Sequence, residues 1–379
     1  MTADPEIARA AQAIAARSER ELEALVAVSS PSGDRHGAEE ALAVCGALLP
    51  DVAEVERIAC SSPDHAPDLL ARVRGEGTAR LLLLGHVDTV IAHSEHRPLS
   101  RVGERLDGSG TIDMKGGVVL ALGVLRDLAA GARPFAEAAL LLVCDEEWRT
   151  APFAHADRFA GFDACLCFEA GQRGPGRAEG VVVRRKAAGT LRVTATGASA
   201  HSGSAPDKGR NALLALARTA EAVAALHDPG GPERLTAVPT VIRSGDAFNV
   251  VPADGELFCD LRADAIAAFD AVLAGVPAEV GGAALRADLV RVWPGMDTRE
   301  AAAPVLAAAS RLLGREVVGM ERGGASDASH LASAVPVTID GLGPRGGGAH
   351  SPSEHVVANT LRERAEVALA VAAAALELR

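Results

Sequence analysis

The residues in this sequence that could do chemistry are acidic side chains and histidines that stand directly after short apolar runs. Three runs have this form, with His86 and Asp88 after 81–84, Asp145, Glu146 and Glu147 after 139–144, and Glu169 after 165–168. If the runs are parallel strands, their carboxyl ends meet at the edge where open α/β sheets bind ligands. Imidazole nitrogens and carboxylate oxygens together form a ligand set that zinc accepts without cysteine.

Two glycine-rich segments supply further candidates. Asp113 follows a Gly-Ser-Gly segment and stands at the start of an expected helix, and His350 follows the glycine run 346–348. Each also has an ordinary structural explanation, because Asp113 suits a helix N-cap and a loop histidine is commonly a surface residue. Asp88 lies two residues after His86, on the same side of an extended chain, so its carboxylate could orient a metal-binding imidazole.

The composition restricts the class of protein. A chain of 379 residues is expected to form about two domains. The formal net charge of −12 argues against a nucleic-acid or anionic-membrane surface, because both need a positive field. The six cysteines form no Cys-x-x-Cys pair and are expected to be reduced thiols. Residues 1–23 lack signal-peptide features and no apolar run is long enough to span a membrane, so we expect a cytoplasmic enzyme for a small molecule.

Two styles of secondary structure alternate along the chain. Buried strands interleave with amphipathic helices in the first part, which predicts an α/β domain whose sheet is covered on both faces. The expected helices are 1–23, 37–49 and 114–130, and the expected strands are 69–73, 80–84, 139–144 and 165–168. The same style returns near the end of the chain, with helices at 299–313 and 360–378 and a strand at 335–339.

Period-two strands replace this pattern in the middle of the chain. The expected strands are 190–196, 237–242, 254–261 and 285–292, and the expected helices are 209–225 and 264–274. Their order, β-α-β-β-α-β, predicts a small domain of the split βαβ, or ferredoxin-like, type. We therefore expect one discontinuous catalytic domain, 1–183 and 293–379, interrupted by an inserted domain, 184–292.

Taken together and in this order, the motifs resemble those of the M20 family of co-catalytic zinc aminoacylases and carboxypeptidases. The segments that carry the resemblance are His86-x-Asp88, 113–117, 145–147, Glu169 and His350-Ser351. Their style is closest to the glutamate carboxypeptidase branch, and the resemblance covers nearly the whole chain. It implies a zinc-peptidase domain with a mixed sheet flanked by helices, and a ferredoxin-like insert that serves as lid and dimerisation domain.

The resemblance also implies two Zn2+ per subunit, with Co2+ or Mn2+ as substitutes. The implied ligands are His86 and Glu169 for one ion, Glu147 and His350 for the other, and Asp113 as a bridge to both. Asp88 is implied to orient His86. Glu146 is implied to be the general base, which takes a proton from a water held between metals ~3.5–4 Å apart and delivers it to the leaving amine.

The expected insert carries further matches to the family. His201 resembles a histidine that reaches the other subunit's site and stabilises the oxyanion, and whether it acts there or within its own subunit stays open. Asn249 and Arg262 are implied to contact the substrate's carboxylate, which suits the planar guanidinium of arginine. A strand-end salt bridge is the alternative for Arg262. In 323–327, outside the insert, Gly324 belongs to a segment that resembles the backbone lining the family's substrate pocket.

Three dipeptides depart from the family's usual residues. Trp293-Pro294 stands where many carboxypeptidase-like members have Arg-Pro, which puts a preference for an acidic side chain in doubt. Thr111-Ile112 and Trp148-Arg149 are also unusual so close to the expected ligands. These departures leave the side chain of the substrate open.

The expected activity is di-zinc-dependent hydrolysis of an amide bond in a small peptide or N-acyl amino acid that bears a free carboxylate. An N-deacylase of the acetylornithine or succinyl-diaminopimelate type is the enzymatic alternative, because it uses the same metals and differs only in pocket residues. A noncatalytic metal-dependent binding protein is the alternative from another class. Retention of Glu146 favours an enzyme, because a binding protein needs no general base. We expect a homodimer formed through the inserted domain.

Overall fold

The computed structural model describes residues 4–131 and 133–377, and the chain forms two compact units. Unit 1 comprises Met1–Arg184, Asp297–Arg322 and Ser326–Arg379, and unit 2 comprises Arg185–Met296 and Gly323–Ala325. The first three residues of the expected helix 1–23 and the last residue of the expected helix 360–378 lie outside the described residues. The predicted domain limits at 183/184 and 292/293 remain predictions, and each unit is described by itself.

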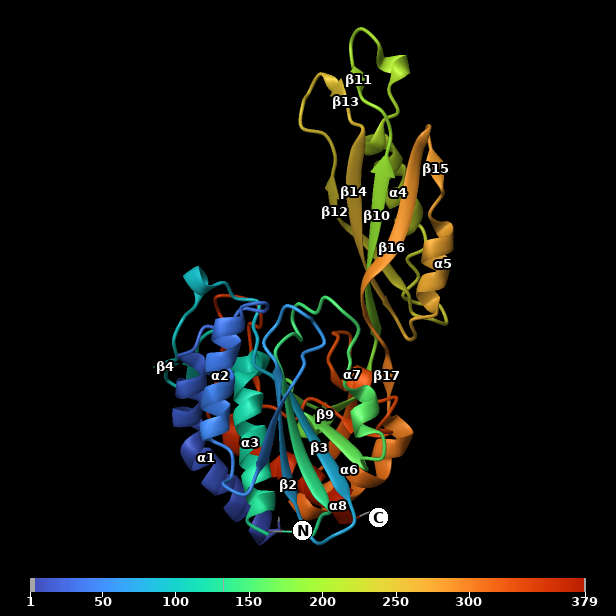
Figure 1. Cartoon of the computed structure of the whole chain (residues 1–379). Coiled ribbons are helices and arrows are strands. Elements are labelled where there is room, and N and C mark those ends of the chain that lie inside the picture. Colours follow the sequence, from blue (N-terminus) through green and yellow to red (C-terminus); the bar gives the residue numbers. More distant parts are fainter. Residues whose placement is uncertain (1–3, 132, 378–379) are drawn as a thin grey trace. The chain divides into compact units, whose positions relative to one another are not determined.

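Unit 1 is built on a mixed six-stranded sheet in the order β1-β2-β6-β3-β7-β19. Two of these strands, β2 and β3, are labelled in Figure 1. The strands are β1 (Glu54–Ile58), β2 (Asp68–Arg74), β3 (Arg80–His86), β6 (Glu137–Val143), β7 (Ala164–Cys167) and β19 (Val337–Ile339). Both pairings of β2 are antiparallel, whereas β6, β3, β7 and β19 run parallel to one another. β3, β6 and β7 are almost entirely buried, as expected for strands covered on both faces. The predicted α/β class is confirmed.

The helices of unit 1 pack mainly against one another and against the centre of this sheet. They are α1 (Pro5–Val26), α2 (Arg35–Ala47), α3 (Gly116–Ala129), α6 (Arg299–Leu313), α7 (Ala328–Leu331) and α8 (Asn359–Glu377). α1, α3 and α8 contact one another, and both α3 and α8 contact β3. The alanine-rich α8 is buried along most of its length, because its small side chains let neighbouring helices approach closely.

Short strands form two further sheets beside the central one. The first contains β8 (Gln172–Arg173), β9 (Glu179–Arg185), β17 (Met296–Asp297) and β18 (Val317–Arg322), and the second contains β4 (Ser100–Val102), β5 (Arg105–Asp107), β20 (Gly346–Gly347) and β21 (His355–Val357). The sequence did not predict them, because most are too short to show a period and β9 lies where the pattern changes. The second sheet is important for the site, because it joins the segment before Asp113 to the strands on either side of His350.

The main elements of unit 2 follow the predicted β-α-β-β-α-β order, and the short strands β11 (Ala200–His201), β13 (Val250–Val251) and β15 (Glu279–Val280) are additional to it. The main elements are β10 (Ala187–Thr196), α4 (Ala212–Ala224), β12 (Thr236–Arg243), β14 (Asp254–Ala263), α5 (Ala268–Gly275) and β16 (Ala283–Trp293). The strands form an antiparallel sheet in the order β12-β14-β10-β16-β15, and β11 and β13 form a separate pair. α4 begins three residues later than predicted because the Asn211 side chain caps it, accepting the N–H of Leu214.

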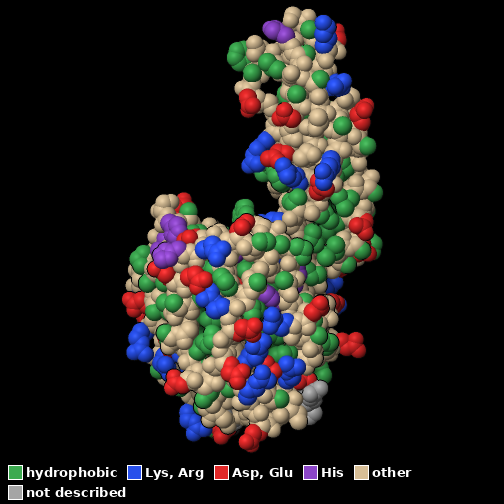
Figure 2. Space-filling view, viewed as in Figure 1, with side chains coloured by type: hydrophobic (Ala, Val, Ile, Leu, Met, Phe, Trp, Pro, Cys, Tyr) green, Lys and Arg blue, Asp and Glu red, His purple; other side chains and the backbone are tan. Residues whose placement is uncertain are grey.

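The face of each unit that is visible in Figure 2 carries mixed charge. Acidic and basic side chains are interspersed over the visible face of each unit (Figure 2). This face therefore lacks the one-signed field that attracts a polyanion. Of the helices formed by residues 4–131 and 133–377, none combines the length and the apolar character that crossing a bilayer requires.

A buried ion cluster joins α8 to β9 and to the loop before β20. Arg364 of α8 is fully buried, and its Nη1 lies 3.1 Å from Glu179 Oε2. Its Nη2 and Nε donate to the carbonyl oxygens of Gly341 and Gly343, at 2.6 and 3.2 Å. Gly343 in turn donates its N–H to the carbonyl oxygen of Glu169 at 2.8 Å. The cluster therefore supports the backbone of a residue at the sheet edge.

Replacing Glu179 by Gln is expected to lower stability at neutral pH and to flatten its acid dependence. Burial opposes ionisation, but attraction by Arg345 and Arg364 outweighs it and holds the pKa of Glu179 below its ordinary value of 4.5. A carboxylate whose pKa is lowered by folding contributes stability above its ordinary pKa, and this contribution is lost as pH falls through the folded-state value.

Urea unfolding between about pH 7 and pH 3 measures both effects. Glu179→Gln should cost on the order of 3 kcal/mol at pH 7, because it leaves buried arginines without their partner. Below pH 4.5 the wild type should lose stability more steeply than the variant. If the free energy of unfolding fell equally steeply with pH in the wild type and the variant, Glu179 would not have this lowered pKa.

Candidate active site

Three adjacent parallel strands bring the first candidate residues together. β3 lies between β6 and β7, so the carboxyl ends of the three strands are neighbours. His86 is the last residue of β3, the acidic trio 145–147 begins two residues after β6, and Glu169 lies two residues beyond β7. The side chains thus gather at the sheet edge where open α/β folds bind ligands.

Asp113 is placed by an irregular turn and not by a helix cap. It lies in the kinked segment Thr111–Lys115, where its φ and ψ of −127° and 89° are non-helical. The N-cap of α3 is Lys115, so the ordinary explanation of Asp113 as an N-cap is wrong. Instead, Asp113 Oδ1 lies 3.2 Å from His86 Nε2, and Asp113 Oδ2 lies 3.0 Å from His350 Nε2.

These contacts create two groups of candidate metal ligands that share one residue. The groups are His86, Asp113 and Glu169, and Asp113, Glu147 and His350. Glu169 Oε1 lies 3.6 Å from His86 Nε2, and Glu147 Oε2 lies 3.2 Å from His350 Nε2. Within each group the possible ligand atoms lie within 4.8 Å of one another. Two imidazoles and three carboxylates so arranged fit divalent metal ions.

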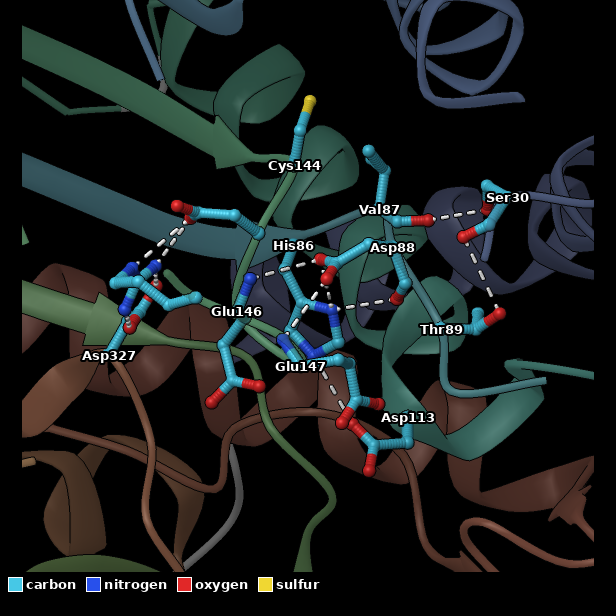
Figure 3. Close-up of polar contacts among 12 residues, drawn as sticks. Ser30, His86, Val87, Asp88, Thr89, Asp113, Cys144, Glu146, Glu147 and Asp327 are labelled. Carbon is cyan, nitrogen blue, oxygen red and sulfur yellow. Dashed lines mark hydrogen bonds and ion pairs between the residues drawn. The ribbon is translucent and has the colours of Figure 1, made fainter. Parts of the chain in front are cut away.

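Asp88 connects a candidate ligand to the backbone of the acidic trio (Figure 3). Its carboxylate lies 3.3 Å from His86 Nδ1, and its backbone carbonyl oxygen lies 3.0 Å from the same nitrogen. The two carboxylate oxygens also accept the N–H groups of Glu146 and Glu147, at 3.2 and 3.0 Å. One buried side chain therefore orients the imidazole and fixes the segment that carries two acids.

Burial and mutual repulsion shift the acid–base behaviour of the cluster. Burial raises the pKa of Glu147 to about 7, and repulsion by Asp113 adds to this against an opposing hydrogen bond from His350. Burial likewise raises the pKa of Glu169. Hydrogen bonds to Asp113 and Glu147 raise the pKa of His350 to about 10. A cation in each group would offset the repulsion and release protons from these groups, so the residues fit a metal site.

Glu146 lies beside these groups but belongs to neither of them. Its side chain extends to the same side as those of Glu147 and Asp113 (Figure 3). Burial raises its pKa well above 4.5, and repulsion by Asp327 contributes against the attraction of His86. A carboxyl group with a raised pKa that stays outside the metal-ligand sets has the features of a proton-transfer group.

Glu354 is a residue of the site that the sequence analysis missed. Its Oε2 accepts the N–H of Gly110 at 2.8 Å, and its Oε1 accepts those of Ile112 and Asp113 at 3.0 and 3.1 Å. The buried carboxylate thus holds the turn that presents Asp113. The only signal in the sequence is an acidic residue four positions after His350, which is uninformative without the fold.

His201 and Asn249 lie together in unit 2. β11, which contains His201, pairs with β13, and the N–H of Ser202 donates to the carbonyl oxygen of Asn249 at 3.0 Å. The exposed imidazole of His201 accepts two backbone N–H groups on Nδ1, from Gly203 at 3.1 Å and Ser204 at 3.2 Å. These bonds place the ring proton on Nε2.

The other two predicted substrate contacts have partners within unit 2. Arg262 lies eight residues along β14 from Asp254, or about 26 Å, which separates it from the β11–β13 pair. Its Nη2 lies 3.0 Å from Asp260 Oδ1, the kind of strand salt bridge weighed as the alternative. The carbonyl oxygen of Gly324 accepts from Arg185 Nη1 at 2.7 Å. Their roles in substrate binding stay predictions.

Glu354→Gln is expected to weaken metal binding, because an amide NH2 replaces one accepting oxygen and faces a backbone N–H. Displacement of Asp113 affects both ligand groups, so chelator competition should show metal affinity lower by about 10- to 100-fold. Circular dichroism should show unchanged secondary structure. Undiminished affinity at both sites would contradict the role assigned to Glu354.

Two relatives match most of the chain. Carboxypeptidase G2 of Pseudomonas sp. (strain RS-16) is 26% identical over 353 residues, which cover 89% of this chain and 83% of that protein. Succinyl-diaminopimelate desuccinylase of Methylobacterium sp. (strain 4-46) is 30% identical over 319 residues, with coverage of 76% and 79%.

A solved structure shares the fold of this chain, and a family profile matches most of its sequence. Aminopeptidase PepT from Bacillus cereus ATCC 10987 superposes with a TM-score of 0.76 at 19% identity, covering 95% of this chain and 98% of that chain. The profile of Peptidase family M20/M25/M40 matches residues 82–374. The predicted resemblance is confirmed: this chain belongs to the M20/M25/M40 peptidase family and is a metallohydrolase that acts on amide bonds.

Proposed function

We propose that the protein is a di-zinc hydrolase that cleaves an amide bond in a small peptide or N-acyl amino acid bearing a free carboxylate. The observation that carries the proposal is the position of Asp113. One of its carboxylate oxygens faces His86 and the other faces His350, so it belongs to both ligand groups. A carboxylate shared in this way fits two adjacent metal ions better than one.

The chemistry of the donor set favours zinc. His86 and Glu169 would hold one Zn2+, Glu147 and His350 the other, and Asp113 both. Imidazole and carboxylate ligands suit Zn2+, and Co2+ or Mn2+ accept the same set. When bound, the ions polarise the attacking water and the scissile carbonyl. Asp88 keeps the imidazole of His86 in the orientation needed for binding.

Glu146 is the proposed general base. Its carboxylate takes a proton from the attacking water and later delivers it to the leaving amine, a task that needs a group beside the metals but not bound to them. The hydrogen bond from its backbone N–H to Asp88 ties its position to that of the ligand His86.

His201 is proposed to stabilise the tetrahedral oxyanion. Because its Nδ1 accepts two backbone N–H groups, Nε2 carries the ring proton and can donate it in a hydrogen bond to developing negative charge. Asn249, Arg262 and Gly324 are proposed to contact the substrate. A substrate carboxylate would compete with Asp260 for the guanidinium of Arg262.

The relatives support two versions of the reaction. Similarity to Carboxypeptidase G2 supports release of a C-terminal amino acid, which is the version we favour. Similarity to a succinyl-diaminopimelate desuccinylase supports an N-deacylase as the second candidate. Both reactions cleave an amide with the same metals, so only the residues that line the acyl pocket distinguish them.

The first test is turnover of a pooled library of dipeptides and N-acyl amino acids by zinc-loaded protein, read by mass spectrometry beside Glu146→Gln. The variant should keep both ions and lose about 10²- to 10⁴-fold in rate, because it lacks the base but no ligand. Glu147→Gln is the matched control and should lose bound metal. Wild-type turnover by Glu146→Gln would refute the assignment, and filled metal sites without any product would favour a noncatalytic binding protein.

We also propose a homodimer formed through unit 2. β12 is an edge strand of the five-stranded sheet, and Val238, Val241 and Ile242 on it are exposed. An edge strand with apolar side chains is a surface that natural proteins usually cover. The exposed position of His201 in the same unit supports the expectation that it reaches the site of a second copy.

A charged edge should separate the subunits. Val241→Lys combined with Ile242→Glu is expected to shift sedimentation from dimer to monomer, because two charges cannot be buried unpaired in an apolar interface. Val52→Lys, at an exposed valine of unit 1, should leave the dimer intact. A wild type that sediments only as a fully active monomer would contradict the proposal.

A further inference from the structure

Arg149 forms a buried bridge between two carboxylates next to the proposed base. Its Nη2 lies 2.7 Å from Asp145 Oδ1 and 2.8 Å from Asp327 Oδ2. Nε also donates to Asp145 at 3.2 Å, and Nη1 donates to the second oxygen of Asp327. Only 6% of the residue is exposed, so these bonds form out of contact with most solvent.

The two partners belong to segments far apart in the sequence. Asp145 directly precedes Glu146, and its carboxylate also accepts the N–H of Ser62 at 2.9 Å. Asp327 is the last residue of the glycine-rich segment 323–327 and the N-cap residue of α7. Arg149 therefore ties the segment after β6 to α7.

The segment that carries Glu146 is held on two sides. Asp88 accepts the N–H groups of Glu146 and Glu147 on one side. On the other side Arg149 joins the preceding residue, Asp145, to Asp327. Figure 3 shows Asp88 and Asp327 on opposite sides of Glu146.

Aromatic packing adds a second link between the same two segments. The guanidinium carbon of Arg149 lies 4.9 Å from the ring centre of Phe153, within the range of a cation–π contact. Phe153 in turn stacks on His330 of α7, with ring centres 5.1 Å apart and an interplanar angle of 15°. The bridge is thus part of a packed unit and is not an isolated ion pair.

We propose that Arg149 is a positioning residue, which fixes the carboxylate of Glu146 for proton transfer by bridging Asp145 and Asp327. The inference rests on the proposed role of Glu146 as base. A lysine would keep the charge but lacks the planar fork that binds two carboxylates at once. A neutral side chain would leave both buried carboxylates uncompensated.

The test compares Arg149→Lys, Arg149→Met and Asp327→Asn, each loaded with zinc and checked for metal content. Arg149→Met should lower kcat by about 100-fold and change KM much less, because the carboxylate of Glu146 is no longer held in place for proton transfer. Arg149→Lys should recover part of the loss. Hydrogen exchange at the amides of Glu146 and Glu147 should be faster in all three variants, which is a readout independent of turnover.

The matched control is Arg133, which bridges Asp4 and Glu377 in unit 1. Arg133→Lys and Arg133→Met should leave kcat and the exchange of residues 145–149 unchanged.

Wild-type kcat and exchange in a metal-loaded Arg149 or Asp327 variant would overturn the proposal, and so would a kcat loss that only follows the loss of metal. If Arg149→Met does not fold, the other two variants decide. Wild-type turnover by Glu146→Gln would contradict the role of Glu146 as general base. The hydrogen-exchange data would still show whether Arg149 holds the segment that carries Glu146.

Discussion

Repulsion among five carboxylates at one edge of the six-stranded sheet is the constraint that the rest of unit 1 must satisfy. The residues are Asp88, Asp113, Glu146, Glu147 and Glu169. Burial removes the water that would screen them, so their ionised forms are stable together only beside positive charge. Two histidines supply part of that charge, and in the proposed scheme two bound cations supply the rest, with Asp113 shared between the two ligand groups. Burial and the same repulsion raise the pKa of Glu146, the proposed proton-transfer group.

A rigid backbone is needed to keep such a cluster together. Asp88 and Glu354 accept main-chain N–H groups of segments that present candidate ligands. Arg364 binds the carbonyl oxygen of Gly343, whose N–H supports the backbone of Glu169. These hydrogen bonds fix the positions of the acidic side chains in the cluster, although in the proposed scheme none of the three residues binds metal. The parallel strands behind them supply the fixed edge from which these loops depart.

Much of this arrangement could be predicted because buried parallel strands appear in the sequence as continuous apolar runs. Topology then brings the residues after those runs to one edge, and α6 has the predicted bounds, Arg299–Leu313. The irregular turn of Asp113 and the roles of Glu354 and Arg149 could not be predicted, because they depend on contacts between distant segments. The role of Arg262 could not be decided from the sequence for a related reason. An arginine on a strand can bind a substrate carboxylate or form a salt bridge with a nearby acid, and here Asp260 is such a partner.

Anomalous diffraction from zinc-loaded crystals, measured above and below the zinc absorption edge, tests the central claim most directly. The account predicts two zinc peaks about 3.5–4 Å apart, one beside His86 and Glu169 and one beside Glu147 and His350, with Asp113 touching both. Glu146 should contact neither ion. A single peak, peaks away from these residues, or a direct bond from Glu146 to zinc would contradict the account.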